Sequence, residues 1–232
     1  MQYIRAMQVI VLLSGGLDSA TVLAMCRAQG LLCHALSFHY GQRHAVELQA
    51  AARVARALGA ASHRVCKIDL GGMGGSALTG QGAVPKGRSD EEIGGGIPAT
   101  YVPARNTLFV AHALAVSEIM GAERIALGIN VLDSSGYPDC RPEWLRAMQE
   151  VARLGTRAGV EGRPVELLAP LVGMTKAEII RAGAALGVDY GLTHSCYDPA
   201  PDGAACGACD SCQIRRRGFQ EAGVSDPTRY AP

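Results

Sequence analysis

A glycine-rich segment near the N-terminus, Ser14-Gly15-Gly16-Leu17-Asp18-Ser19, carries the residue types that bind phosphate. Glycines let the backbone approach a phosphate closely, while serine hydroxyls and exposed N–H groups at a helix N-terminus donate hydrogen bonds to its oxygens. The segment lacks the lysine and the longer spacing of the Walker-type loop, which argues against a GTPase-like site. We therefore predict a nucleotide-phosphate site; the alternative is a tight strand-to-helix turn capped by Ser14 or Asp18.

Four of the eight cysteines gather near the C-terminus. Cys206, Cys209 and Cys212 form a CxxCxxC pattern, and nine residues separate Cys196 from it. Thiolates brought together by short turns, with Gly207 in one of them, suit tetrahedral Zn²⁺ in a closed structural site. An iron–sulfur cluster uses the same ligands and is the alternative, whereas disulfides are disfavoured in a cytoplasmic enzyme. We predict one structural zinc ion per chain.

Three polar segments stand where an α/β fold holds its ligands, beyond strand ends or at a helix start. Residues 40–44 follow the second apolar run, and residues 130–141 follow a strand expected to end at Ile129. Arg105 and Asn106 stand at a helix start, where the arginine is suited to bind an anion and the asparagine to cap the helix. Each segment alone is more often a polar loop than a site, but together with the phosphate loop they predict a shared pocket.

The elements that must position these residues alternate between short apolar runs and helical stretches of about a dozen residues. Such alternation is typical of a parallel sheet with helices on both faces. We therefore predict a doubly wound, Rossmann-like α/β fold. The expected strands are residues 9–13, 33–38, 65–70 and 124–129, and the expected helices are residues 19–29, 45–58, 107–120, 142–157 and 175–186.

The chain is long enough for one sizeable core, and its pattern changes after Pro170. We expect a nucleotide-binding α/β domain over residues 1–170 and a helical C-terminal part over residues 171–232. This second part holds the zinc site as a small appendage, and its last 45 residues are expected to add little core. Thr175 and Glu178 have the spacing of a capping box at its helix start.

A glycine-rich stretch, residues 71–97, interrupts the expected α/β domain and contains few large apolar residues. Loops of this length in a compact domain are usually functional or disordered. We predict a mobile loop that acts as a lid and excludes water from the site; a merely disordered insert is the alternative.

The overall composition limits the partners of the chain. The 232 residues carry a formal net charge of +1, with 48% hydrophobic and 19% charged residues. No overall field attracts a long polyanion, and the basic run Arg215-Arg216-Arg217 is typical of a solvated helix face. No segment approaches the roughly 20 apolar residues of a membrane span, and the N-terminus has no signal-peptide pattern. We expect a cytoplasmic enzyme that binds neither nucleic acid nor membrane.

The phosphate loop resembles that of the pyrophosphatase-type ATP-using enzymes, the adenine nucleotide alpha hydrolase-like group. Its members break ATP between the α and β phosphates to adenylate a substrate oxygen. The resemblance implies that Ser14 and the glycines grip pyrophosphate, that Asp18 orients phosphate bound to Mg²⁺, and that Ser19 caps the helix. Lys176 resembles the group's later lysine, so Asp18 and Lys176 are the expected catalytic residues. The residues expected to bind ATP are Leu13, Ser14, Gly15, Gly16, Leu17, Asp18, Ser19, Ala20, Thr21, Val22, Leu23 and Lys176.

Motifs along essentially the whole chain resemble one family within this group. They are SGGLDS, FHYGQRH with Glu47, VPARN, NVLDSSGYPDCR, MTKAEI, and SCY followed by CGACDSC. In this order and spacing they resemble the QueC family, whose members make 7-cyano-7-deazaguanine in queuosine biosynthesis. The resemblance implies a carbon–nitrogen ligase that uses ATP to join 7-carboxy-7-deazaguanine and ammonia through an activated carboxylate and an amide. It also implies a homodimer, and leaves open whether the second activation is adenylation or phosphorylation.

The substrate contacts follow from residue chemistry. Carboxylates can accept hydrogen bonds from the N–H groups of the base, an arginine can pair with its carboxylate, and a tyrosine can stack on its ring. The residues expected to contact the substrate are Tyr40, Gln42, Arg43, His44, Arg105, Asn106, Asp133, Tyr137, Asp139 and Arg141.

Two other functions compete with this one. A tRNA thiolase or lysidine synthase would share the phosphate loop but predicts basic patches and an added RNA-binding domain, which the near-neutral charge disfavours. A zinc-ribbon interaction module with a degenerate nucleotide fold would consume no ATP.

Overall fold

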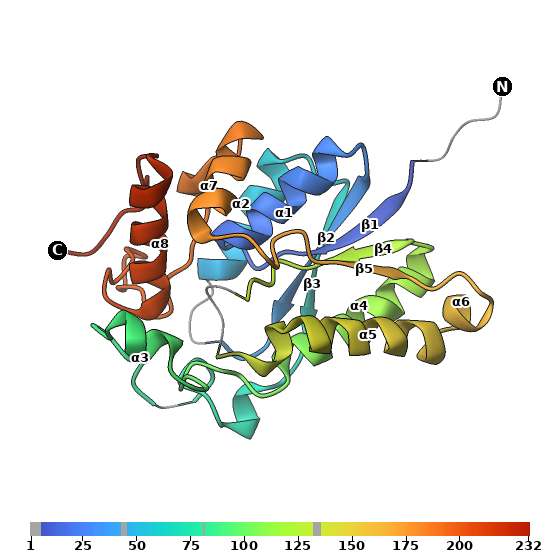
Figure 1. The fold of residues 1–232 in the computed structure, drawn as a ribbon, viewed down its shortest axis with the longest axis horizontal. Helices are drawn as coiled ribbons and strands as arrows, with labels where there is room; N and C mark the ends of the chain where they lie inside the picture. The colour runs from blue at the N-terminus through green and yellow to red at the C-terminus, as the bar shows by residue number, and fades with distance from the viewer. Residues whose placement is uncertain (1–5, 43–45, 81, 132–135) are drawn as a thin grey trace.

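The computed structural model describes residues 6–42, 46–80, 82–131 and 136–232 (Figure 1). Its centre is a parallel five-stranded sheet in the order β3-β2-β1-β4-β5. The strands are β1 (Gln8–Leu12), β2 (Leu32–His39), β3 (Ser62–Lys67), β4 (Arg124–Ala126) and β5 (Glu166–Leu168). The chain adds strands on one side of β1 and then crosses to the other side. The predicted doubly wound parallel sheet is therefore confirmed.

Three strands differ from the sequence prediction for a physical reason. β4 ends at Ala126 and not at Ile129, because Leu127 and Ile129 are buried beyond the strand and so prolong its apolar run. β3 begins at Ser62, three residues before the expected segment 65–70. β3 is an edge strand in which no residue is buried. Its sequence therefore has no apolar run that shows where the strand begins and ends. β5 was not predicted, because its three residues are too few to show a periodicity.

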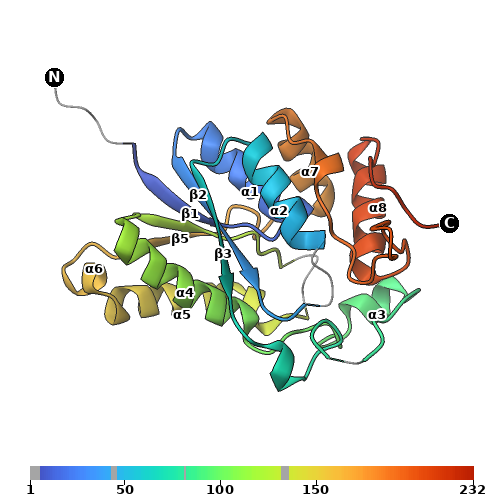
Figure 2. The ribbon, with the colours of Figure 1, turned by 180° about the vertical axis from the view of Figure 1, so that it is seen from behind.

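Helices cover both faces of the sheet (Figures 1 and 2). On one face lie α1 (Leu17–Ala28), α2 (Val46–Ala57) and α7 (Lys176–Ala185), and on the other lie α4 (Arg105–Met120) and α5 (Pro142–Gly155), the latter followed by α6 (Arg157–Val160). The capping box at the start of α7 is confirmed, since the side chains of Thr175 and Glu178 each accept the backbone N–H of the other. Each described helix is too short or too polar for a membrane crossing.

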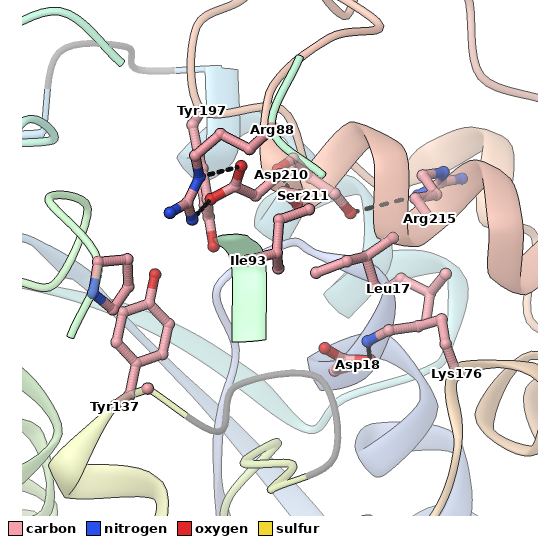
Figure 3. Close-up of a pocket in the computed structure, with 14 residues that line it drawn as sticks. Leu17, Asp18, Arg88, Ile93, Tyr137, Lys176, Tyr197, Asp210, Ser211 and Arg215 are labelled. Carbon is pink, nitrogen blue, oxygen red and sulfur yellow. Dashed lines mark hydrogen bonds and ion pairs between the residues drawn. The ribbon is translucent and has the colours of Figure 1, made fainter. Parts of the chain in front are cut away.

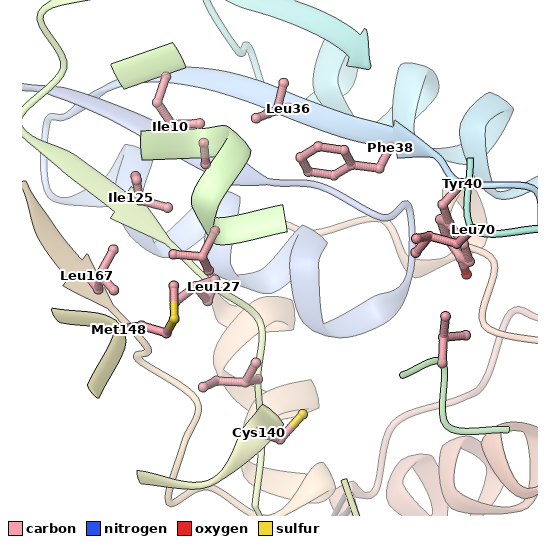
Figure 4. Packing of buried hydrophobic residues seen from close by; sticks show 14 of the residues in the cluster. Ile10, Leu36, Phe38, Tyr40, Leu70, Ile125, Leu127, Cys140, Met148 and Leu167 are labelled. Carbon is pink, nitrogen blue, oxygen red and sulfur yellow. The ribbon is translucent and has the colours of Figure 1, made fainter. Parts of the chain in front are cut away.

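Alternating side chains of the central strand enter two hydrophobic cores. Val9 and Val11 of β1 pack with residues of α1, α2 and α7. Ile10 packs on the opposite face with residues of α4 and α5, including Met148 (Figure 4). A strand buried on both faces reads as a continuous apolar run, which is what the sequence QVIVL of β1 shows.

The C-terminal region contributes more to the core than the sequence indicates. α8 (Asp210–Ala222) lies beside α7 (Figure 1), and Phe219 is 2% exposed in the same core as Val9 and Ile180. The expectation of little core in the last 45 residues is therefore wrong. α8 is mostly polar and charged, but Phe219 in it is deeply buried. The composition of the segment alone does not reveal this burial.

The basic run on α8 is also not a uniformly solvated face. Arg215 is 3% exposed. Its guanidinium donates to Asp226 Oδ1 at 3.1 Å, to Thr193 Oγ1 at 2.9 Å and to the Tyr190 carbonyl at 3.1 Å. Because partners surround the charge, its burial is tolerated. The solvated-face interpretation is wrong for this residue.

Residues 71–97 form an excursion from the sheet that contains two short helices, η1 (Gly71–Met73) and α3 (Asp90–Gly94). Several of its apolar side chains are buried in the core on the α4 side. α3 lies next to α8 in both views (Figures 1 and 2), and Arg88 pairs with Asp210 there. The segment thus has many contacts, and its opening as a lid stays a prediction.

Candidate active site and metal centre

The phosphate loop joins the carboxyl end of β1 to the N-terminus of α1. Gly16 is the N-cap residue of this helix. The hydroxyl oxygens of Ser14 and Ser19 lie 3.1 Å apart, and Ser19 Oγ donates to the Gly16 carbonyl at 3.1 Å. Both hydrogen bonds join residues of the turn to one another. The N–H groups of the first helical turn therefore stay available for an anion.

Gly15 shows why the loop requires glycine. Its φ is +90°, and a Cβ there would lie 2.4 Å from the Glu47 carbonyl oxygen and 2.5 Å from the Ala51 nitrogen. Only glycine accommodates both the backbone conformation and the close approach of α2. The N–H of His194 donates to the Gly15 carbonyl at 2.9 Å, so the C-terminal region also holds the loop.

Asp18 and Lys176, far apart in sequence, form an ion pair beside the loop. Lys176 Nζ lies 2.6 Å from Asp18 Oδ1, and the two side chains are 11% and 32% exposed. Asp18 is in the first turn of α1, and Lys176 is the first residue of α7. The pair places one carboxylate and one ammonium group at a phosphate-binding helix terminus. A carboxylate there can hold a divalent cation, and the ammonium group can neutralise phosphate oxygens.

A cavity of about 240 Å³ opens in front of the loop, at the carboxyl ends of β1, β2 and β4. The chain reverses direction across the sheet between β1 and β4, and ligands of open parallel sheets bind at such switch points. Its lining combines apolar and polar side chains. They include Leu36, Phe38, Phe109, Leu127 and Ile129 on the apolar side, and Ser14, Asp18, Arg105 and Asn130 on the polar side.

Arg105 faces this cavity from the start of α4. Its Cζ lies 5.7 Å from the centroid of the Tyr40 ring, and its Nη1 donates to Tyr40 Oη at 3.5 Å. That contact is the only hydrogen bond of its guanidinium to a described residue. Ala104 before it has a φ of +54°, a strained value for a residue with a Cβ. A guanidinium with donors to spare is suited to bidentate binding of a carboxylate.

Half of the twelve residues predicted to bind ATP line this cavity, and Lys176 lines a second, smaller cavity. Leu13, Ser14, Gly16, Leu17, Asp18 and Ser19 line the larger one. Residues 20–23 do not, because α1 turns them into the interior, where their side chains have no exposed surface. Thr21 instead shares a hydrogen bond of 2.9 Å with the Tyr190 hydroxyl. The side chains of residues 20–23 therefore give no support to their predicted contact with ATP, and the ATP site as a whole stays a prediction.

The predicted substrate contacts divide in the same way. Asp139 is 5% exposed, and its carboxylate accepts the Asn106 N–H at 2.9 Å, so it holds the start of α4 in place of lining the cavity. Arg141 is exposed, lines neither cavity and precedes α5. Arg43, His44 and Asp133 lie outside the described residues. The predicted residues that do line the cavity are Tyr40, Gln42, Arg105, Asn106 and Tyr137.

Many residues of the cavity wall were not predicted as site residues, and three of them bear on its chemistry. They are Glu47 in the first turn of α2, Phe109 in α4 and Tyr197 beside the cysteine cluster. Burial raises the pKa of Glu47 to about 7, and the charge of Arg105 opposes this shift. Glu47 and Phe109 follow predicted segments by one helical turn, a signal that could have found them. Tyr197 reaches the cavity wall only because the segment that bears the cysteines folds back toward the cavity.

A smaller cavity of about 90 Å³ lies between the phosphate loop, α3 and α8. Figure 3 shows the Asp18–Lys176 pair on one side of it and the Arg88–Asp210 pair on the other. Ile93 of α3 contributes to the same wall. The glycine-rich excursion and the C-terminal region therefore build one side of the site together.

The four cysteines predicted to bind zinc converge. Their Sγ atoms all lie within 4.8 Å of one another, and the set is Cys196, Cys206, Cys209 and Cys212. Zn–S bonds of about 2.3 Å in a tetrahedron place sulfur atoms about 3.8 Å apart, so a small movement closes the site around one ion. Four sulfur atoms this close to one another suit one shared metal ion better than two separate disulfides. The residues present fit zinc.

Backbone groups around the cluster favour thiolates. Cys196 Sγ accepts N–H groups from Asp198 at 3.4 Å and Cys206 at 3.2 Å, and Cys206 Sγ accepts the Cys209 N–H at 3.3 Å. Gly207 has a φ of +71°, which allows the tight turn between two of the ligands. Such N–H···S bonds orient ligands and stabilise their negative charge. The cluster is thus organised as a closed structural site.

Known proteins resemble this chain along its length. The family model described as queuosine biosynthesis protein QueC matches residues 8–223. A 7-cyano-7-deazaguanine synthase from Desulfatibacillum aliphaticivorans is 57% identical over 233 residues and covers 100% of both chains. A protein of the same name from Kineococcus radiotolerans is 61% identical over 221 residues, covering 95% of this chain and 96% of its own.

A solved structure supports the fold. A 4-thiouridine synthetase in complex with RNA and bound ATP matches with a TM-score of 0.51 and 19% identity, over 93% of this chain and 50% of its own. At this identity the likeness shows the fold alone, a parallel α/β sheet like that of the adenine nucleotide alpha hydrolases. The family model and the full-length relatives go further than the fold, and by them this chain belongs to the QueC family of queuosine biosynthesis proteins.

Proposed function

We propose that this enzyme is a 7-cyano-7-deazaguanine synthase, which converts 7-carboxy-7-deazaguanine, ammonia and ATP to the nitrile. The observation that carries the proposal is the position of the Asp18–Lys176 pair. It stands at the phosphate loop, where Asp18 lines the 240 Å³ cavity that also exposes the Arg105 guanidinium, and Lys176 lines the smaller cavity beside it. The two cavities share several wall residues, Asp18 among them, and together they offer groups for a triphosphate and for an organic carboxylate. Membership in the QueC family supports the identity of that carboxylate.

The first step needs activation of a carboxylate, whose oxygen is a poor leaving group. Attack of a carboxylate oxygen on the α phosphorus of ATP forms an acyl adenylate and releases pyrophosphate. The loop residues Ser14 and Gly16 and the Lys176 ammonium group would hold that pyrophosphate, and Arg105 would orient the carboxylate. Positioning and charge neutralisation account for this step, so it requires no side-chain nucleophile.

The second step forms the nitrogen bond. Ammonia attacks the acyl carbon, AMP leaves, and the amide forms with loss of a proton to solvent. A second ATP then activates the amide oxygen. This oxygen leaves together with the phosphate-containing group attached to it, the two amide N–H protons are released to solvent, and the C≡N bond forms. We propose adenylation for this activation too, because the same loop and lysine serve both rounds.

Two metal ions complete the proposal. Mg²⁺ bound to ATP would contact the Asp18 carboxylate and offset phosphate charge. Zn²⁺ would be held by the four clustered cysteines and would keep the C-terminal region folded against the site. We also propose a homodimer; Ile119, Leu154 and Val160 are 81%, 63% and 77% exposed on the α4–α6 side, and sedimentation equilibrium of the purified chain tests it.

The test uses the full chain with both nucleotide and substrate. Mass spectrometry should detect the nitrile and one AMP per activation when 7-carboxy-7-deazaguanine, ammonium and ATP are supplied. Replacing Lys176→Met should lower kcat/KM by at least about 100-fold, because charge on the transferred phosphates is no longer neutralised. The matched control, Lys67→Met on the edge strand β3, should retain full activity. Nitrile formation by K176M at the wild-type rate, or no nitrile from the wild type, refutes the proposal.

A further inference from the structure

Glu47 is a carboxylate at the cavity that the proposed chemistry has not used. It lies in the first turn of α2, and its backbone packs against the phosphate loop at Gly15. An acidic residue in a first turn often serves only to stabilise the helix dipole from a solvated position. Glu47 instead lines the 240 Å³ cavity, and burial raises its pKa to about 7 against the influence of Arg105. The cost of this burial indicates a role other than helix stabilisation.

Two opposite charges thus face one cavity without neutralising each other. Among the described residues, no ion pair within 4.0 Å and no hydrogen bond involves the Glu47 carboxylate. Within the described part of the chain, the Arg105 guanidinium makes one hydrogen bond, to Tyr40 Oη. Buried charges in proteins are normally paired, so a ligand with complementary groups on two edges would satisfy both.

The lining of the same cavity includes aromatic rings and other apolar side chains. The rings of Phe38 and Phe109 are stacked at 4.1 Å with an interplanar angle of 6°, and the Tyr40 ring lies 5.6 Å from Phe109. Leu48 and Leu78 complete this part of the lining. A planar heterocycle is the ligand shape that such a surface binds best.

We infer that Glu47 is the residue that selects a guanine-like base, by accepting hydrogen bonds from the ring N1–H and the exocyclic 2-amino group, while Arg105 takes the carboxylate. This inference rests on the proposed function. A carboxylate matches two adjacent N–H donors in bidentate geometry. Asp139, which was expected to serve this purpose, is already committed to the Asn106 N–H.

The test measures binding of 7-carboxy-7-deazaguanine to the full chain by calorimetry, apart from turnover. Replacing Glu47→Gln should weaken binding by at least about 10-fold, because the amide offers one acceptor and places a donor against the second N–H. An analogue without the 2-amino group should bind the wild type weakly and bind E47Q with little further loss. The matched control is Glu143→Gln on exposed α5, which should bind as the wild type does.

The outcomes separate the two proposals. A wild type that does not bind the substrate refutes the proposed function itself. Wild-type binding with equal affinity for E47Q, or equal discrimination of the analogue by both proteins, refutes the role of Glu47 alone. If E47Q instead raises only the KM for ammonium, Glu47 acts on ammonia and the inference is overturned. Circular dichroism and a thermal melt of E47Q establish that the variant is folded.

Discussion

Single residues of one chemical type take different roles here because their surroundings differ. Asp18 is paired with Lys176 at a helix N-terminus, Asp139 holds the start of α4, and Glu47 faces the cavity without a hydrogen bond to any described residue. The sequence treats these carboxylates as equivalent candidates. Their partners in space distinguish the carboxylate that pairs with a lysine beside the phosphate loop, the one that accepts a backbone N–H and the one that faces the cavity.

The Glu47 carboxylate predicts how the free energy of unfolding of the ligand-free protein depends on pH. The pKa of Glu47 rises from an ordinary value of 4.5 to about 7 through burial, so the folded state binds a proton that the unfolded state has already released. The free energy of unfolding should therefore fall as pH rises from about 4.5 to about 7, and this contribution should be constant above that range. Arg105 and Tyr40 face the same group but stay protonated throughout this window.

Urea unfolding of wild type and Glu47→Gln over this pH range measures the effect. The stability of the wild type relative to E47Q should decrease by on the order of 1 kcal/mol or more across the window. Parallel pH curves for the two proteins would contradict the assignment. Subtracting the E47Q stability from the wild-type stability at each pH removes the contributions of the titrating groups that the two proteins share.

At the scale of elements, the glycine-rich excursion is joined to the cysteine-bearing turn. Gly87 N–H donates to the Ala208 carbonyl at 2.9 Å, and Arg88 Nε donates to Asp210 Oδ1 at 3.1 Å. The Arg88 and Asp210 side chains are 20% and 8% exposed, so removing either partner would leave the other charge partly buried and uncompensated. The metal site therefore positions α3, which forms part of the site wall.

Replacing Arg88→Ala should release the excursion. Removing the arginine leaves Asp210 unpaired in a partly buried place, and residues 71–97 should be cleaved by thermolysin at least about 5-fold faster than in the wild type. The KM for ATP should rise as well, because the wall next to Lys176 becomes mobile. Arg146→Ala, which removes an exposed pair on α5, serves as the control. Unchanged proteolysis in R88A would show that this pair does not hold the segment.

At the scale of the whole molecule, the C-terminal region and the sheet form one structure. Phe219 of α8 shares a core with Val9 of β1, and Arg215 holds the segment that carries Thr193. The cysteine cluster at the start of α8 therefore fixes elements on both sides of the cavity. Its metal should stabilise the entire fold and not only a local turn.

Loss of the metal should consequently destabilise the whole protein. Cys206→Ser should lower the metal content to background and decrease Tm by at least about 5 °C. Cys66→Ser on β3, outside the cluster, should keep both values close to wild type. Elemental analysis and a thermal melt of the same samples check this. A Cys206→Ser protein with full metal content, or iron in place of zinc, would contradict the zinc assignment.

The sequence by itself determined the central strands, the glycine-rich turn between β1 and α1, and which four cysteines gather in one cluster. These features are local: a doubly buried strand is a continuous apolar run, a glycine loop precedes its helix directly, and three of the four cysteines recur at every third residue. Only the tertiary structure decided which distant side chains meet. It paired Asp18 with Lys176, assigned Asp139 to the backbone of α4, buried Arg215, and left Glu47 and Arg105 facing one cavity. The physical reason is that a partner across the sheet sets a side chain's charge and exposure, and sequence periodicity carries no information about that partner.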